Sequence, residues 1–186
     1  MTLQRLMLPL VLAAALLAAA PVAAEDYVQA GGALTFATSY QGETFVGDFP
    51  GFRSTMRFDP ARPQDARLEV VIPLGGASTD DEDRDGTLQG AAFFNVATFP
   101  EARYTAQGFA HLGGDRYSTD GVLELRGVKR PVTLEFTLSS EAHPALAGRA
   151  TVNRLAFGVG GGDWADVSVI PAEVAISTRV RFVPAP

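Results

Sequence analysis

The sequence contains no cysteine and only two histidines. Disulfide bonds, a thiolate nucleophile and cysteine metal ligands are therefore excluded, and hydrophobic burial must stabilise the fold. His111 and His143 stand far apart beside glycine and proline residues, so no histidine pair has metal-ligand spacing. The chain also has no G-x-S-x-G elbow and no H-E-x-x-H motif. No pattern indicates an enzyme, and the sequence predicts no catalytic residue, metal ligand or cofactor.

Basic clusters are missing as well. Fifteen lysine and arginine residues stand against 21 acidic residues, which gives a formal net charge of −6. An acidic chain without a basic patch is a poor partner for nucleic acid and for anionic membrane surfaces. The charge balance therefore argues against both classes of partner.

A long apolar run occurs at the N-terminus, where Arg5 precedes residues 6–20 and small residues follow up to Ala24. This layout is typical of a signal peptide, because the apolar core is too short to span a bilayer. We predict cleavage after Ala24; the alternative is an uncleaved membrane anchor. The mature chain, residues 25–186, would then be one exported domain in the periplasm with no stable membrane anchor.

The rest of the chain alternates apolar and polar residues with a period of two. The alternation is clear in residues 33–40, 132–138 and 174–182, and turn signals such as Gln41-Gly42 and Gly113-Gly114 separate the runs. This pattern predicts an all-β, antiparallel fold of seven to nine strands, each with one apolar face. Periodicity alone leaves a closed barrel and a two-sheet sandwich as alternatives.

Residues 84–108 interrupt this alternation. A short helix is expected near residues 85–92, and Phe93, Phe94 and Phe99 follow it closely. Three phenylalanines in seven positions need an apolar environment. We therefore expect this segment to plug one end of a barrel or to close over a cavity.

The same segment resembles the YceI-like family of bacterial periplasmic lipid-binding proteins, in which the corresponding run is close to RDxHLxxxxFFDVxxYP. Thr87 stands where a histidine is usual and Asn95 where an aspartate is, while the pattern is matched by Arg84, Asp85, Leu88, Phe93, Phe94, Val96 and Pro100. Further family-like pieces occur in order at residues 46–60, 121–136 and 153–160, although Ala156 replaces a usual aspartate. The resemblance covers nearly the whole predicted mature chain.

The resemblance implies a lipocalin-like, extended antiparallel eight-stranded β-barrel. It also implies that the lumen holds a long isoprenoid chain, either a polyprenyl lipid or an isoprenoid quinone, for transport or storage in the periplasm. We select wall candidates from the apolar strand faces and the phenylalanine segment: Leu34, Phe36, Phe49, Met56, Phe58, Phe93, Phe94, Phe99, Tyr104, Leu134, Phe136 and Phe157. The alternative is a ligand-free barrel that acts as a stress-response or protein-interaction module. The oligomeric state is open, and a homodimer is one option.

Two polar features leave alternatives open. Asp81, Asp83, Asp85 and Gly86 form the first half of a calcium loop, but Ala92 stands where the closing glutamate is needed. One interpretation of this segment is a weak cation site, which could serve a metal-dependent enzyme. The alternative is a solvated turn in which Asp83 or Asp85 caps the helix. The family pattern also singles out Arg84-Asp85 and Asn153-Arg154. Their arginines could pair with protein carboxylates or meet the polar head of a ligand.

Overall fold

The structure is a computed structural model, and it describes residues 24–139 and 141–186. The predicted signal peptide, residues 1–24, lies outside the described residues apart from its last position, and it stays a prediction. The described part contains one α-helix, α1 (Glu82–Gln89), and three 3-10 helices, η1 (Pro63–Asp65), η2 (Arg154–Phe157) and η3 (Gly162–Trp164). It also contains ten strands: β1 (Glu25–Tyr40), β2 (Glu43–Asp48), β3 (Arg53–Phe58), β4 (Arg67–Pro73), β5 (Glu101–Gln107), β6 (Ala110–Gly113), β7 (Arg116–Leu125), β8 (Val128–Leu138), β9 (Ala145–Asn153) and β10 (Glu173–Pro184). No helix in these two ranges is long and apolar enough to cross a membrane.

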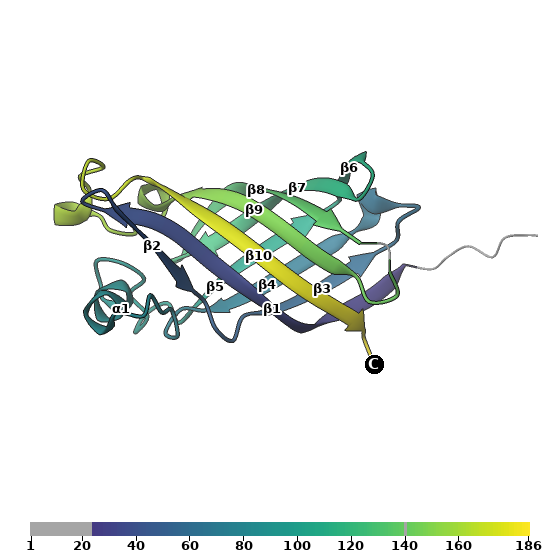
Figure 1. Ribbon diagram of the computed structural model, residues 1–186, viewed down its shortest axis with the longest axis horizontal. Helices are drawn as coiled ribbons and strands as arrows, with labels where there is room; N and C mark the ends of the chain where they lie inside the picture. The colour runs from purple at the N-terminus through teal and green to yellow at the C-terminus, as the bar shows by residue number, and fades with distance from the viewer. Residues whose placement is uncertain (1–23, 140) are drawn as a thin grey trace, which may run out of the picture.

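Eight of the strands form one closed antiparallel barrel, in the order β1, β3, β4, β5, β7, β8, β9 and β10 (Figure 1). The barrel closes because β1 pairs with β10 along one edge, with Leu34 opposite Thr178, and with β3 at the start of its other edge. The second half of that edge pairs with β2, while β6 pairs with β7. The predicted eight-stranded lipocalin-like barrel is confirmed, and the sandwich alternative is wrong.

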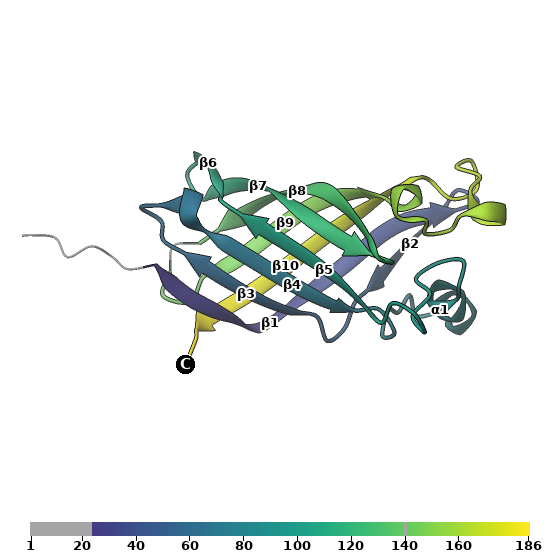
Figure 2. The ribbon, with the colours of Figure 1, turned by 180° about the vertical axis from the view of Figure 1, so that it is seen from behind.

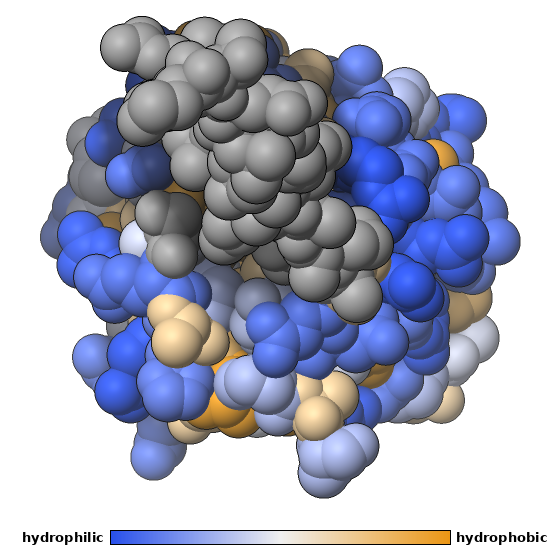
Figure 3. All heavy atoms as spheres, turned by 90° about the vertical axis from the view of Figure 1, so that its right-hand side faces the viewer, coloured by the Kyte–Doolittle hydropathy of each residue, from blue (hydrophilic) through white to orange (hydrophobic). Residues whose placement is uncertain are grey.

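The two ends of the barrel are built differently (Figures 1 and 2). One end, the closed end, holds the start of β1, the end of β10, η1 and the short strand β6. The other end, the open end, holds α1 and the long connection between β9 and β10 that contains η2 and η3. Seen end-on, the part of the closed end that grey atoms leave visible is mostly hydrophilic (Figure 3).

Aromatic rings fill the lumen near the closed end. The ring centroids of Phe58 and Tyr117 lie 5.6 Å apart, and Phe109 lies 5.9 Å from Phe58 and 5.0 Å from Phe136. Tyr117 and Phe136 stack at 5.7 Å. Edge-to-face and offset pairs at these distances pack well, and each ring is buried. We call these four residues the aromatic cluster; half of the lumen is therefore solid core.

Helix α1 begins and ends three residues earlier than the predicted range of 85–92. Asp81, not Asp83 or Asp85, is its N-cap, since its carboxylate accepts a hydrogen bond of 2.9 Å from the amide of Arg84. The helix ends at Gln89, and its C-cap, Gly90, has extended backbone angles. The sequence offers Asp81, Asp83 and Asp85 in this turn, and each is a favoured type of N-cap residue.

Candidate ligand-binding cavity

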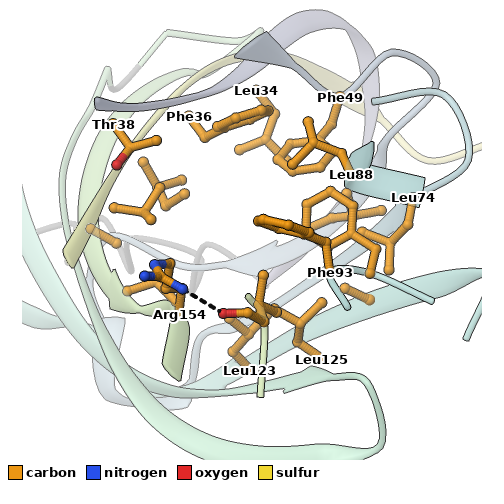
Figure 4. A pocket seen from close by; sticks show the side chains of 18 of the residues that line it. Leu34, Phe36, Thr38, Phe49, Leu74, Leu88, Phe93, Leu123, Leu125 and Arg154 are labelled. Carbon is orange, nitrogen blue, oxygen red and sulfur yellow. Dashed lines mark hydrogen bonds between the residues drawn. The ribbon is translucent and has the colours of Figure 1, made fainter. Parts of the chain in front are cut away.

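A cavity of about 430 Å³ occupies the lumen near the open end (Figure 4). Its wall comes from the inward faces of the strands and from the two long connections at this end. Apolar residues dominate the wall: Leu34, Phe36, Phe45, Phe49, Val70, Ile72, Leu74, Leu88, Phe93, Phe94, Ala102, Leu123, Leu125, Val132, Leu134, Ala150, Val152, Val159, Trp164, Ile170, Val174 and Ile176. Polar side chains of Asp83, Arg84 and Thr87 also reach it, from α1.

Seven of the twelve predicted wall residues border this cavity: Leu34, Phe36, Phe49, Phe93, Phe94, Tyr104 and Leu134. The other five do not. Phe58 and Phe136 belong to the aromatic cluster, and Met56 is buried among the same half of the lumen. Phe157 is buried in η2, and Phe99 is partly buried against Gly127. The apolar face of a strand is readable from sequence, but the depth of a residue along the barrel axis is not.

Several wall residues were missing from the prediction. Val132 alternates in the same run as Leu134, and Val174 and Ile176 alternate in the run of residues 174–182, so the period of two is the signal for all three. Trp164 and Ile170 come from the connection between β9 and β10, which has no strand periodicity. Their position follows from tertiary structure alone.

Two buried glycines, Gly47 on β2 and Gly121 on β7, leave space for aromatic rings of the cavity wall. A Cβ atom at Gly121 would lie 2.3 Å from Cζ of Tyr104, and one at Gly47 would lie 2.3 Å from Cζ of Phe36. Tyr104 thus crosses strand β7 and donates a hydrogen bond of 3.1 Å to the carbonyl of Val132 on β8. Burial raises the pKa of Tyr104 to about 12, so its phenol is neutral at physiological pH.

Two of the three phenylalanines of the predicted plug, Phe93 and Phe94, border the cavity, whereas Phe99 does not. Phe94 packs on Phe49 with a centroid distance of 5.9 Å, and Phe49 lies 5.1 Å from Phe36. Phe93 meets Trp164 edge-to-face at 5.4 Å. The segment after α1 therefore joins the strand wall to the connection between β9 and β10.

Arg84 and Asp85, the pair that the family pattern singles out, attach α1 to the barrel. The guanidinium of Arg84 lies 4.3 Å above the ring of Phe45 on β2 and 3.5 Å from the carboxylate of Asp81. The carboxylate of Asp85 accepts hydrogen bonds from the amide and hydroxyl of Thr79, both 2.7 Å, and from Ser78 at 3.0 Å. Ser78 in turn pairs with Asp48 through two backbone hydrogen bonds, so Asp85 connects α1 to the end of β2.

This attachment should be sensitive to acid. Desolvation acts to raise the pKa of Asp85, but the hydrogen bonds from Thr79 and Ser78 and the charge of Arg84 outweigh it, so the pKa is lowered from 3.8. A carboxylate with a lowered folded-state pKa stabilises the structure above its ordinary pKa, and this contribution is lost as the pH falls through the folded-state value.

We therefore expect α1 to be fully attached at pH 7 and to loosen below about pH 4. Asp85→Asn should lower the local opening free energy by about 1 to 2 kcal/mol at pH 7, and hydrogen exchange at the amide of Thr79 measures it. The variant should also lose most of the acid dependence. Equal exchange in the two proteins at pH 7 would contradict this role.

Arg154 is the second arginine of the family pattern, and it pairs with backbone carbonyls, not with a carboxylate. It is only 4% exposed. Its guanidinium donates hydrogen bonds of 2.7 to 3.0 Å to the carbonyls of Val159, Gly160, Trp164, Ile170 and Pro171. Burial lowers the pKa of Arg154. Because these five acceptors match the five N–H donors of a guanidinium, Arg154 fixes the connection between β9 and β10 at the cavity wall.

Arg126 ties the open end together, and no pattern in the sequence indicated it. Its Nη1 lies 3.1, 2.5 and 2.5 Å from the carbonyls of Ala92, Phe93 and Gly158. These carbonyls belong to the segment after α1 and to the residue after η2. The turn between β7 and β8, which carries Arg126, is thereby joined to both long connections.

The acidic turn holds no cation-binding arrangement of its side chains. Asp81 caps α1 and pairs with Arg84, while Asp85 points to Ser78 and Thr79. In residues 24–139 and 141–186, no three histidine or acidic side chains come together in a way that could hold a metal ion. Asn153, beside Arg154, accepts hydrogen bonds from the amides of Leu155 and Ala156 and so caps η2.

Fold and cavity together define a closed antiparallel β-barrel with an apolar chamber at one end. The family follows from comparison with known proteins: the model of the YceI-like domain matches residues 27–182. The chain belongs to the YceI-like family, as its sequence motifs predicted.

Relatives of similar sequence are known as UPF0312 proteins. One from Pseudomonas savastanoi pv. phaseolicola is 29% identical over 164 residues, which cover 82% of this chain and 85% of that protein. One from Yersinia pestis is 36% identical over 102 residues, 55% of this chain and 53% of that protein. The match thus spans about half the length of the Yersinia relative.

Solved structures share the fold. The chain is similar to BcnA from Burkholderia cenocepacia, with a TM-score of 0.77, 25% identity and coverage of 81% of this chain and 95% of BcnA. It is also similar to a polyisoprenoid binding domain from Saccharophagus degradans, with a TM-score of 0.66, 14% identity and coverage of 88% and 100%. For the YceI protein of Campylobacter jejuni, the TM-score is 0.64, the identity is 18%, and the match covers 75% of this chain and 84% of that protein.

Proposed function

We propose that this protein binds an isoprenoid chain, either a polyprenyl lipid or an isoprenoid quinone, in the open half of its lumen, and carries or stores it in the periplasm. The observation that carries this proposal is the apolar cavity of about 430 Å³ inside a closed barrel. Pockets that enclose small ligands measure roughly 300 to 1,000 Å³. The periplasmic setting is supported by the predicted signal peptide.

The chemistry of the wall fits a hydrocarbon chain. Two hydroxyl groups at the wall already have partners: Tyr104 donates to the carbonyl of Val132 and Thr178 donates to the carbonyl of Ala33 at 3.2 Å. A ligand beside these two residues does not have to supply hydrogen bonds, whereas the buried hydroxyl of Thr38 at the same wall has no hydrogen-bond partner among the described residues. Asp83, Arg84 and Thr87 lie on α1, which places polar groups at the open end, where the head of a lipid would meet water.

The size of the ligand follows from energetics. Each buried methylene contributes about 0.8 kcal/mol, while association costs on the order of 4 to 15 kcal/mol. An acyl chain of about six carbons would therefore bind poorly. A chain of several isoprene units gains enough, and the likeness in fold to a polyisoprenoid binding domain supports the same ligand class.

The ligand-free barrel is the competing function. It needs a lumen filled by the protein's own side chains, and only the closed half of the lumen meets this condition. The cavity of the open half favours the carrier.

Native mass spectrometry of protein purified gently from its own periplasm tests the proposal, with denaturing extraction to identify any released molecule. We expect one isoprenoid lipid per chain. An apo mass together with no uptake of added geranylgeraniol or solanesol would overturn the proposal.

A pair of variants separates binding from stability. Phe93 borders the cavity, whereas Phe157 is equally well buried but does not border it. Each change to alanine should cost about 3 to 5 kcal/mol of stability. Only Phe93→Ala should also lower the affinity for geranylgeraniol, by about tenfold or about 1.4 kcal/mol. The fluorescence of Trp164, the single tryptophan, reports binding because its ring contacts Phe93 at the cavity wall. Since Phe93→Ala alters this contact, native mass spectrometry provides a second measure of affinity.

A further inference from the structure

The cavity ends abruptly halfway along the barrel. On four strands, one inward residue borders the cavity and the next inward residue toward the closed end is buried core: Val70 and Leu68 on β4, Tyr104 and Ala106 on β5, Leu134 and Phe136 on β8, Thr178 and Val180 on β10. The second member of each pair is only 4% or 5% exposed. The boundary therefore runs across the lumen as a floor.

Phe136 is the residue of this floor that connects it to the aromatic cluster. Its ring lies 5.0 Å from Phe109 and 5.7 Å from Tyr117. On β9, a Cβ atom at Gly148 would lie 3.1 Å from Leu134, 3.2 Å from Phe136 and 3.3 Å from Thr178. Two wall residues and Phe136 thus converge on one glycine, and the floor is tightly packed at this point.

From this arrangement we infer that Phe136 sets the length of isoprenoid chain that the lumen encloses. The inference rests on the proposed function and makes it more specific. The aromatic cluster occupies the rest of the barrel. An isoprenoid chain longer than the cavity must therefore leave its remaining carbons outside the lumen, at the open end of the barrel. Phe136 is a specificity-determining residue in this view, although it does not border the cavity.

Affinity measured against chain length tests the inference. Geraniol, farnesol, geranylgeraniol and solanesol carry the same head group on increasingly long chains. Burial of one carbon raises the affinity by about fourfold. Each added isoprene unit that the lumen encloses contains several such carbons and should therefore raise the affinity by at least about tenfold. Once the cavity is full, the affinity should stay constant within about twofold as the chain grows. Trp164 fluorescence gives the dissociation constants.

Three variants then locate the floor. Phe136→Ala joins the space of the ring to the cavity, and the plateau should move to a longer alcohol, with about a tenfold gain for that alcohol. Phe58→Ala is the matched control: it removes the same ring from the same cluster, 5.6 Å from Tyr117, but its inward neighbours on β3, Met56 and Ser54, do not border the cavity. Leu134→Phe fills the cavity above the floor, so its plateau should move to a shorter alcohol.

Each outcome decides the matter. A plateau that moves in opposite directions in Phe136→Ala and Leu134→Phe, and stays in place in Phe58→Ala, supports the inference. An affinity that keeps rising through solanesol overturns the length limit but leaves the proposed function intact. An equal shift in Phe58→Ala, or no shift in any variant, also overturns it. Absence of binding by every alcohol overturns the proposed function and the limit together. If Phe136→Ala does not fold, Phe136→Leu, which removes part of the same ring, takes its place: a plateau at a longer alcohol supports the inference, and an unchanged plateau overturns it.

Discussion

Replacing Arg154 by methionine is expected to lower the free energy of unfolding by about 3 to 5 kcal/mol. Methionine has a long side chain without donors, so the carbonyls of Val159, Gly160, Trp164, Ile170 and Pro171 lose the partner that satisfies them. Buried carbonyls without a donor are destabilising, and hydrogen bonds from a charged group are stronger than average. The removal of a desolvated charge offsets only part of this loss.

Equilibrium unfolding in urea measures the effect of Arg154→Met. Arg179→Met on the outer face of β10 is the control, because Arg179 is exposed and should tolerate the change within about 0.5 kcal/mol. Arg154→Lys should lie between the two, since an ammonium group has three donors and lacks the planar fork. Stability of Arg154→Met within about 1 kcal/mol of the wild type would show that the five carbonyls find other partners.

Replacing Gly121 by alanine is expected to weaken isoprenoid binding by about 100-fold. The new methyl group would lie 2.3 Å from Cζ of Tyr104, so the ring must leave the barrel wall. The space into which it can turn is the cavity. A phenol ring there displaces about one isoprene unit of ligand, which accounts for most of the lost affinity.

A second change in the same protein checks this cause. Tyr104→Ala in the Gly121→Ala background should bring the affinity back to within about tenfold of the wild type, because the obstructing ring is gone. Gly75→Ala is the control, since a Cβ atom at Gly75 meets nothing within 4 Å. If Gly121→Ala binds as tightly as the wild type, then Tyr104 does not turn into the cavity.

The barrel could be predicted because period-two alternation and the family motifs agree, and both depend on local sequence. Leu34 and Phe36, for example, alternate with polar residues and do face the lumen. The exact limits of α1 could not be predicted, since Asp81, Asp83 and Asp85 are chemically equivalent caps. The choice among them depends on tertiary contacts: the hydroxyls of Ser78 and Thr79 donate hydrogen bonds to the carboxylate of Asp85, which is therefore not available as the cap.

The cavity was harder to predict than the fold. Phe58 and Leu134 have the same alternation, yet one lies in packed core and the other at the cavity. Their difference is the height along the barrel axis, which depends on strand tilt and register. The five acceptors of Arg154 were also hidden, because backbone carbonyls have no sequence signature and these lie on loops whose path is set by the arginine itself.

The pairing of β1 with β10 has a consequence for how the chain acquires its structure. The barrel cannot close until the last strand is available, so closure joins segments at opposite ends of the described sequence. Folds dominated by such distant contacts form slowly, on the order of milliseconds to seconds. Until then β1 and β9 both present unpaired edges, which favour association with other chains. The protein is therefore expected to be most prone to aggregation just before β10 docks, and a chain shortened before β10 should remain in that state.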